Sequence, residues 1–196
     1  MIVLASGSRI RSQLLANAGV AHEIVVPRVD EQAVKQAMLA EEAPARDIAD
    51  KLAELKGLRA SLRHPETLVL AADQVLVCRG VLYNKPSDSK ELHNQLSSLR
   101  GQTHELLSAA VICEGGKPVW RHIGRAQLVM RSFSDTFLSE YIYREGAGLL
   151  ETVGGYKLEE TGSQLFSRVQ GDYFSVLGLP LLEILGFLRA RGHLTE

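Results

Sequence analysis

The sequence predicts an α/β protein with a long, twisted, mixed β-sheet flanked by helices. In the first half of the chain, short apolar strands alternate with amphipathic helices, and in the second half segments typical of antiparallel strands cluster. Of the 196 residues, 45% are hydrophobic and 23% are charged, which is typical of a folded chain and excludes intrinsic disorder. Because one domain commonly has ~100–200 residues, we expect a single domain over residues 1–196.

The predicted strands are apolar runs bounded by turn residues. They cover residues 2–5, 22–26, 67–72, 75–78, 106–113, 118–130, 164–169 and 173–176. Arg79 and Gly80 turn the chain back after the fourth run, and Gly115 and Gly116 join the two longest strands.

The predicted helices combine apolar residues at a spacing near 3.6 with terminal signals. They cover residues 8–19, 29–39, 45–62, 88–99, 134–144 and 180–192. Ser8 and Ser134 are N-cap candidates, Pro180 opens the last helix, and Gly19 and Gly192 end the helices that precede them.

The charge balance and the cysteines limit the partners and the compartment. A net charge of −1 gives no basic excess for binding a nucleic-acid polymer. The apolar N-terminal stretch is too short for a signal peptide, and no apolar run reaches the ~18 residues of a membrane span. We therefore expect a cytoplasmic protein without membrane contact, in which Cys78 and Cys113 are buried thiols and not a disulfide.

A candidate anion site follows the first strand, at residues 6–11 (SGSRIR). The backbone N–H groups at the start of a helix bind anions. Arg9 and Arg11 fall in the first helical turn, where a cation opposes the helix dipole. A bound phosphate would relieve this conflict, and the alternative is that both arginines point into solvent.

Asp73 is the second candidate, because it interrupts an otherwise apolar strand. Burying an unpaired carboxylate is costly, so we expect Asp73 at a strand end or bulge that faces a cleft. There it would act as a metal ligand or general base. The alternative is a carboxylate satisfied by a loop or by Lys85.

Further polar groups lie next to predicted elements, and they indicate a site only when they are considered together. The acidic pair Asp30–Glu31 follows the second strand, and Lys56 flanks the apolar stripe of its helix. Lys85 precedes a proline, and the glycine-rich segment 154–162 has polar side chains that suit a pocket. Taken singly, the acidic pair and Lys56 are more typical of ordinary solvated charges, whereas Lys85 and the segment 154–162 are as typical of turns as of a site.

Several chemistries lack their markers in this sequence. There is no HExxH pattern for zinc and no GxSxG for a nucleophilic serine. There is also no GxxxxGK[ST] or GxGxxG phosphate-binding loop. An aspartyl-phosphate phosphatase would normally show DxD after a strand, and here the sequence reads Asp73-Gln74-Val75.

A set of ordered motifs along nearly the whole chain resembles the Maf-like (septum-formation-inhibitor-like) nucleoside triphosphate pyrophosphatases. The motifs are LASGSRIRSQLLANAG at the start, VDE (29–31), LAELK (52–56), AADQV (71–75), NKPSD (84–88), GQTHELLSAAV (101–111), GGYKLEETG (154–162) and GDYFSVLGLPL (171–181). The resemblance implies an inosine triphosphate pyrophosphatase-like fold, with two lobes, a central cleft and often a homodimer.

The resemblance also implies an activity. Such an enzyme hydrolyses a nucleoside triphosphate to the monophosphate and pyrophosphate with a divalent cation, Mg²⁺ or Mn²⁺. The implied role is removal of modified or noncanonical nucleotides from the nucleotide pool. The alternative reading is a noncatalytic nucleotide-binding regulator of cell division that uses the same cleft.

Matching positions carry the family's site residues onto this chain. The resemblance assigns Ser6, Ser8 and Arg11 to the phosphate-binding loop, Asp73 and Lys56 to catalysis, Glu31 and Asp73 to the metal, and Lys85, Lys157 and Glu159 to substrate binding. Arg9 stands where the family loop usually has proline, which leaves one family-like arginine. Gln74 and Lys157 are more similar to the branch acting on 7-methyl-GTP than to the dTTP/UTP branch.

Overall fold

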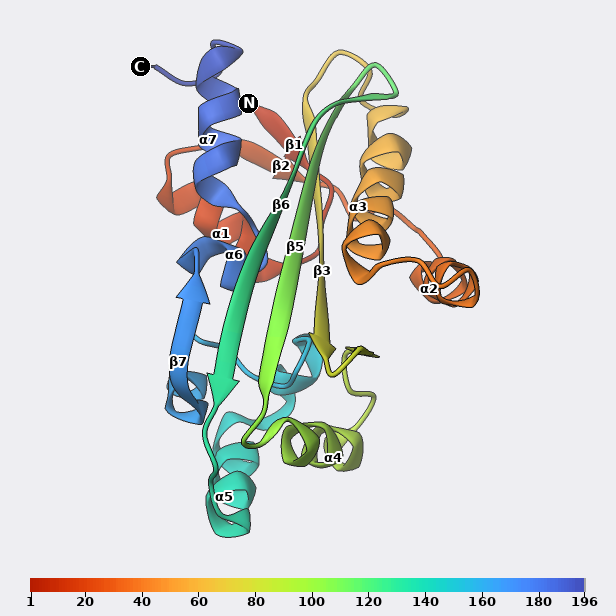
Figure 1. Cartoon of the computed structure of the whole chain (residues 1–196). Coiled ribbons are helices and arrows are strands. Elements are labelled where there is room, and N and C mark those ends of the chain that lie inside the picture. Colours follow the sequence, from red (N-terminus) through yellow and green to blue (C-terminus); the bar gives the residue numbers. More distant parts are fainter. Residues whose placement is uncertain (196) are drawn as a thin grey trace. The chain divides into compact units, whose positions relative to one another are not determined.

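The computed structural model describes residues 1–195 and confirms the α/β class with a mixed sheet (Figure 1). The strand order is β2-β1-β3-β5-β6-β7, and β4 pairs with β3. Strand β1 runs parallel to β2 and β3, whereas the β3–β4 and β6–β7 pairs are antiparallel.

The bounds of the strands and helices agree with most of the predicted segments. The strands are β1 (Ile2–Leu4), β2 (His22–Ile24), β3 (Val69–Cys78), β4 (Val81–Tyr83), β5 (Thr103–Glu114), β6 (Lys117–Met130) and β7 (Phe166–Gly171). The α-helices are α1 (Arg9–Asn17), α2 (Glu31–Ala40), α3 (Ala45–Ser61), α4 (Ser89–Leu99), α5 (Asp135–Glu145), α6 (Tyr173–Val176) and α7 (Leu181–Ala190). Two short 3₁₀ helices, η1 (Gly146–Glu151) and η2 (Thr161–Leu165), were not predicted.

The chain divides into two compact units. Unit 1 comprises Met1–Gln74, Leu107–Gly124 and the residues from Asp172 onward, and unit 2 comprises Val75–Leu106 and Arg125–Gly171. Strands β3, β5 and β6 each contribute residues to both units.

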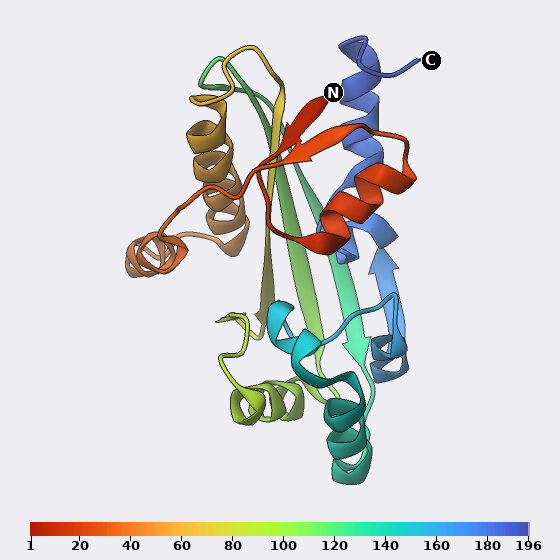
Figure 2. The same ribbon diagram turned by 180° about the vertical axis from the view of Figure 1, so that it is seen from behind.

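In unit 1, helices lie on both sides of the strands. Figures 1 and 2 both show α3 on the side of the strands opposite to α7. Successive side chains of a strand point to opposite faces, and β3 follows this rule. Asp73 contacts Lys56 of α3, whereas Gln74 contacts the backbone of α6.

Unit 2 has its own apolar core, to which α4 contributes one buried face. Leu92, Leu96 and Leu99 of α4 are buried. Strand β7 pairs with the end of β6, with an irregularity between Val129 and Met130.

One local prediction was wrong, and another was confirmed for the position of the residue alone. Residues 173–176 form helix α6 and not a strand, because the Asp172 side chain accepts a hydrogen bond from the Ser175 N–H (2.7 Å) and caps the helix. Ser8 occupies the N-cap position of α1, but its side chain makes no capping hydrogen bond.

The prediction of two buried thiols is confirmed by the structure. Cys78 and Cys113 are buried, free cysteines. Within residues 1–195, no helix combines the length and apolarity that crossing a membrane requires.

Candidate active site

Three charged residues of unit 1 meet at one point. Lys56 Nζ lies 2.6 Å from Asp73 Oδ1 and 2.9 Å from Glu31 Oε1. Helix α3 carries the lysine, strand β3 the aspartate and the first turn of α2 the glutamate. The sequence patterns singled out all three residues, and the structure brings them together.

Asp73 lies in the middle of β3, so the expectation of a strand end or bulge was wrong. Its side chain is 8% exposed, which is tolerated because the Lys56 ammonium neutralises the carboxylate within hydrogen-bonding distance. The second carboxylate oxygen, Oδ2, is buried without a hydrogen-bond partner among the described residues. Asp73 therefore keeps one uncommitted acceptor atom inside an ion-pair cluster.

Close packing of α3 against the sheet brings Lys56 to this point. A Cβ atom on Gly57 would lie 2.8 Å from Cys113 Sγ and 3.3 Å from Ala71 Cβ. The absent side chain lets the helix approach the strands, and Lys56, the preceding residue, extends its ammonium to β3 with only 12% of its side chain exposed.

Glu31 is held more loosely than Asp73. Its side chain is 45% exposed, and helix α2, which carries it, has no buried residue. The helix begins where the Asp30 side chain accepts a hydrogen bond from the Ala33 N–H (3.0 Å).

Arg11 does not point into solvent. Its Nε donates to the Gly178 carbonyl (2.8 Å), and its Nη1 donates to the Ala72 carbonyl (2.8 Å) and to Ser6 Oγ (3.2 Å). Burial lowers the pKa of Arg11 below its ordinary value, and the charges of Asp73 and Glu31 oppose that shift. Arg11 is thus a positive charge held next to the acidic residues of the cluster, whereas Arg9 is exposed.

The predicted anion-binding loop has the features of a helix N-terminus that is open to a ligand. Ser6 is buried, and its Oγ accepts a hydrogen bond from the Ser8 N–H (3.3 Å). Helix α1 has no side-chain cap and no acidic residue in its first turn. Its N-terminal N–H groups can therefore receive an anion.

Gln74 is a residue of this site whose role the sequence did not reveal. Its Nε2 lies 2.9 Å from Ser108 Oγ, 3.1 Å from the Ser175 carbonyl and 3.0 Å from the Val176 carbonyl. The amide nitrogen is thus used within the protein, tying β3 to α6. A polar residue beside Asp73 in a buried strand was the only available signal.

The remaining predicted substrate-binding residues belong to unit 2. Lys85 follows β4 and is exposed. Lys157 and Glu159 lie on the segment 154–162, where Lys157 Nζ is 3.3 Å from Glu160 Oε2 and Glu159 is exposed.

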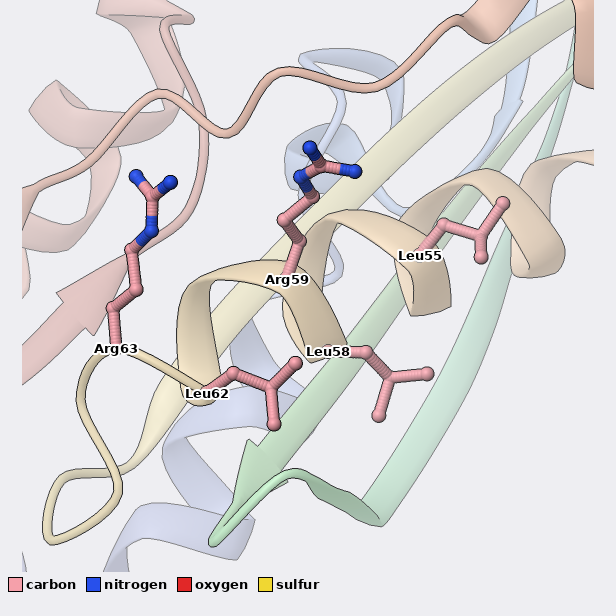
Figure 3. A pocket seen from close by; sticks show the side chains of 5 residues that line it. All are labelled: Leu55, Leu58, Arg59, Leu62 and Arg63. Carbon is pink, nitrogen blue, oxygen red and sulfur yellow. The ribbon is translucent and has the colours of Figure 1, made fainter.

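A hollow of about 380 Å³ lies elsewhere, along the outer side of α3. Figure 3 shows its five lining side chains, three from this helix and two from the residues that directly follow it: Leu55, Leu58, Arg59, Leu62 and Arg63. None of them is a predicted site residue, so the hollow is not the candidate site.

Comparison with known proteins decides the family. The family model described as "Maf-like protein" matches residues 1–191. The chain belongs to the Maf-like family. The match extends over residues of both units.

Relatives over nearly the full length carry one name. The chain is 54% identical over 193 residues to the "Nucleoside triphosphate pyrophosphatase" of Roseobacter denitrificans, covering 98% of this chain and 97% of the relative. The protein of the same name from Ruegeria pomeroyi is 54% identical, with 97% and 96% covered. That from Caulobacter vibrioides is 49% identical, with 99% and 97% covered.

The residues of this Maf-like chain fit a divalent cation of the Mg²⁺ type. The described residues contain no cluster of three or more His, Cys, Asp or Glu side chains. Mg²⁺, however, is usually bound by one or two carboxylates together with water and substrate phosphates. The Asp73 and Glu31 carboxylates, which Lys56 brings together, are donors of that kind.

Proposed function

We propose that this chain is a nucleoside triphosphate pyrophosphatase that converts a nucleoside triphosphate to the monophosphate and pyrophosphate. The observation that supports this most directly is the Glu31–Lys56–Asp73 cluster. The names of the full-length relatives support the same activity. The proposed role is removal of modified or noncanonical nucleotides.

The charges of unit 1 suit a triphosphate, which carries close to four negative charges. The uncapped N-terminus of α1, with Ser6 and Ser8, supplies backbone N–H groups and a positive dipole end. Arg11 adds a fixed cation, although three protein oxygens already accept hydrogen bonds from its Nε and Nη1. We therefore propose that Arg11 acts on the phosphates partly by shaping the Ser6 loop.

In the proposed reaction, water attacks the α-phosphorus and the bond to the bridging oxygen of the β-phosphate breaks. Asp73 accepts the proton of the attacking water at Oδ2, the carboxylate oxygen without a protein partner. Lys56, bonded to Oδ1, holds the carboxylate in place. Pyrophosphate then leaves with the bridging oxygen.

A divalent cation belongs to this proposal. Glu31 and Asp73 would hold Mg²⁺ or Mn²⁺, which when bound neutralises phosphate charge and polarises the α-phosphate. Because Lys56 contacts both carboxylates, its ammonium would share them with the cation.

Three residues of unit 2 also belong to the proposal. By their match to the family, Lys85, Lys157 and Glu159 contribute to substrate binding. We also propose a cytoplasmic enzyme that acts as a homodimer and does not bind a nucleic-acid polymer. We do not assign a base from Gln74, because its amide nitrogen bonds to Ser108 and α6.

The test is a substitution of Asp73 assayed on several nucleotides. The wild type, Asp73→Asn and the control Asp47→Asn, an exposed residue of α3, are compared on ATP, GTP, CTP, UTP, dTTP and 7-methyl-GTP with Mg²⁺, Mn²⁺ or EDTA. Pyrophosphate and phosphate are quantified separately. We expect Asp73→Asn to lower pyrophosphate release by ~10²–10⁴-fold, the usual contribution of general base catalysis.

Three outcomes would contradict the proposal. Near-normal release by Asp73→Asn would remove Asp73 from catalysis, and release of phosphate would indicate a phosphatase. Binding of nucleotides without any pyrophosphate release would indicate the noncatalytic regulator.

A further inference from the structure

His104, at the start of β5 in unit 2, is a buried titratable side chain that the proposed chemistry does not use. It is 1% exposed, and its Nε2 lies 2.8 Å from Tyr156 Oη. Its Nδ1 has no hydrogen-bond partner among the described residues. Burial lowers the pKa of His104 to about 4, so the imidazole is neutral at pH 7. An apolar side chain at this position would avoid the cost of the unpaired Nδ1. What the histidine provides and an apolar side chain would not is the hydrogen bond to Tyr156.

The Tyr156 ring is fixed on more than one side. Its centroid lies 5.7 Å from that of His104 and 4.8 Å from that of Phe166, with an edge-to-face arrangement in the second pair. Tyr156 is 5% exposed. The ring and its hydroxyl are therefore both anchored in the core of unit 2.

The segment 154–162 is built tightly around this anchor. Gly155 has φ +71°, and a Cβ atom there would lie 2.2 Å from Leu92 Cδ1. At the other end of the segment, a Cβ atom on Gly162 would lie 2.4 Å from the Lys157 carbonyl oxygen. The segment thus lies against α4 at its start and folds back on Lys157 at its end.

Lys157 directly follows the anchored tyrosine, and its side chain is 29% exposed. We propose that His104 is a positioning residue for nucleotide binding, because its hydrogen bond to Tyr156 fixes the segment that carries Lys157 and Glu159. This inference rests on the proposed function, in which Lys157 and Glu159 bind the nucleotide. It predicts an effect of His104 on KM and not on the chemical step at Asp73.

The test is a double-mutant cycle on the nucleotide of the panel that the wild type hydrolyses fastest. KM, kcat and Tm are measured for His104→Phe, Tyr156→Phe and the double variant. His104→Gln provides a rescue, since its amide can bond to the tyrosine hydroxyl. Tyr143→Phe provides a matched control, since it removes a hydroxyl from a 91% exposed side chain of the same unit.

We expect each single variant to raise KM by ~2–10-fold, the range for one lost hydrogen bond, with little change in kcat. The double variant should be no worse than the poorer single variant, because both remove the same bond. The KM of His104→Gln should be close to the wild-type KM, and the KM of Tyr143→Phe should equal the wild-type KM. If His104→Phe does not fold, Tyr156→Phe and His104→Gln still test the bond.

Other results overturn the inference. It fails if Tyr156→Phe keeps a wild-type KM while Lys157→Ala raises KM, or if the single effects on KM multiply in the double variant. If Lys157→Ala and Glu159→Gln both leave KM unchanged, the segment does not bind nucleotide and the inference fails with that assignment. Pyrophosphate release that depends on Asp73 would still stand in that case.

Discussion

Replacing Lys56 by methionine tests the ion-pair cluster through stability. Methionine keeps the length and apolar stem of the side chain but removes the ammonium that contacts Asp73 Oδ1 and Glu31 Oε1. Asp73 Oδ2 already lacks a partner, so the buried carboxylate would lose its only ion-pair contact among those described. Glu31, being half-exposed, would be rehydrated at little cost.

The size of the effect follows from the burial of the pair. Breaking a buried ion pair by removing one partner costs ~3–5 kcal/mol. We expect the lower end, about 3 kcal/mol, because the nearby charge of Arg11 remains. For a chain of this length, ~2–4 °C of Tm correspond to each kcal/mol, so Tm should fall by about 6–12 °C.

The double variant Lys56→Met/Asp73→Asn separates the charge effect from packing. It removes both members of the closest pair, so most of the lost stability should return. Pyrophosphate release should remain as low as in Asp73→Asn. Urea denaturation and thermal unfolding measure stability, and a pyrophosphate assay measures activity. A Lys56→Met protein as stable as the wild type, or a double variant whose two losses simply add, would refute this reasoning.

Two further predictions concern stability. Burial lowers the pKa of His104 from 6.5 to about 4, so between these pH values the unfolded chain binds more protons than the folded chain. The free energy of unfolding should therefore fall by up to about 3 kcal/mol as the pH decreases from about 6.5 to about 4. Urea titrations should lose this slope in His104→Gln, and an unchanged slope would contradict the assignment. Gln74→Glu would direct a carboxylate at two carbonyl oxygens near 3 Å, and we expect a loss of ~1–3 kcal/mol. Gln36→Glu on exposed α2 is the control, and equal stability of the two variants would argue against the contacts of Gln74.

The sequence could propose residues for the candidate site, but it could not predict which of them contact one another. Asp73 stood out because a carboxylate in an apolar strand needs an explanation, but no local pattern could pair it with Lys56, which lies on another element. The burial of Arg11 depends on the carbonyl of Gly178, a contact between distant parts of the chain. The spacing of apolar residues predicts which face of a helix is buried, but it does not predict which element packs against that face.

The error at residues 173–176 had a different origin. The apolar and aromatic run favoured a strand, whereas the Asp172 side chain satisfies the Ser175 N–H and starts a helix. The capping signal was present in the sequence and was outweighed by composition. The fold class was predicted correctly, because alternating helices and strands favour a sheet with parallel pairs.

Cys113 and Ala71 leave no room for a side chain at Gly57, which affects how mutational data on this chain should be read. In a saturation library scored by activity, position 57 should be as intolerant as its neighbour Lys56. Even alanine, which usually improves a helix by about 1 kcal/mol over glycine, would push α3 away from the strands and withdraw the lysine from Asp73. An intolerant position here would therefore report on the space between a helix and a sheet, and not on any chemistry of its own.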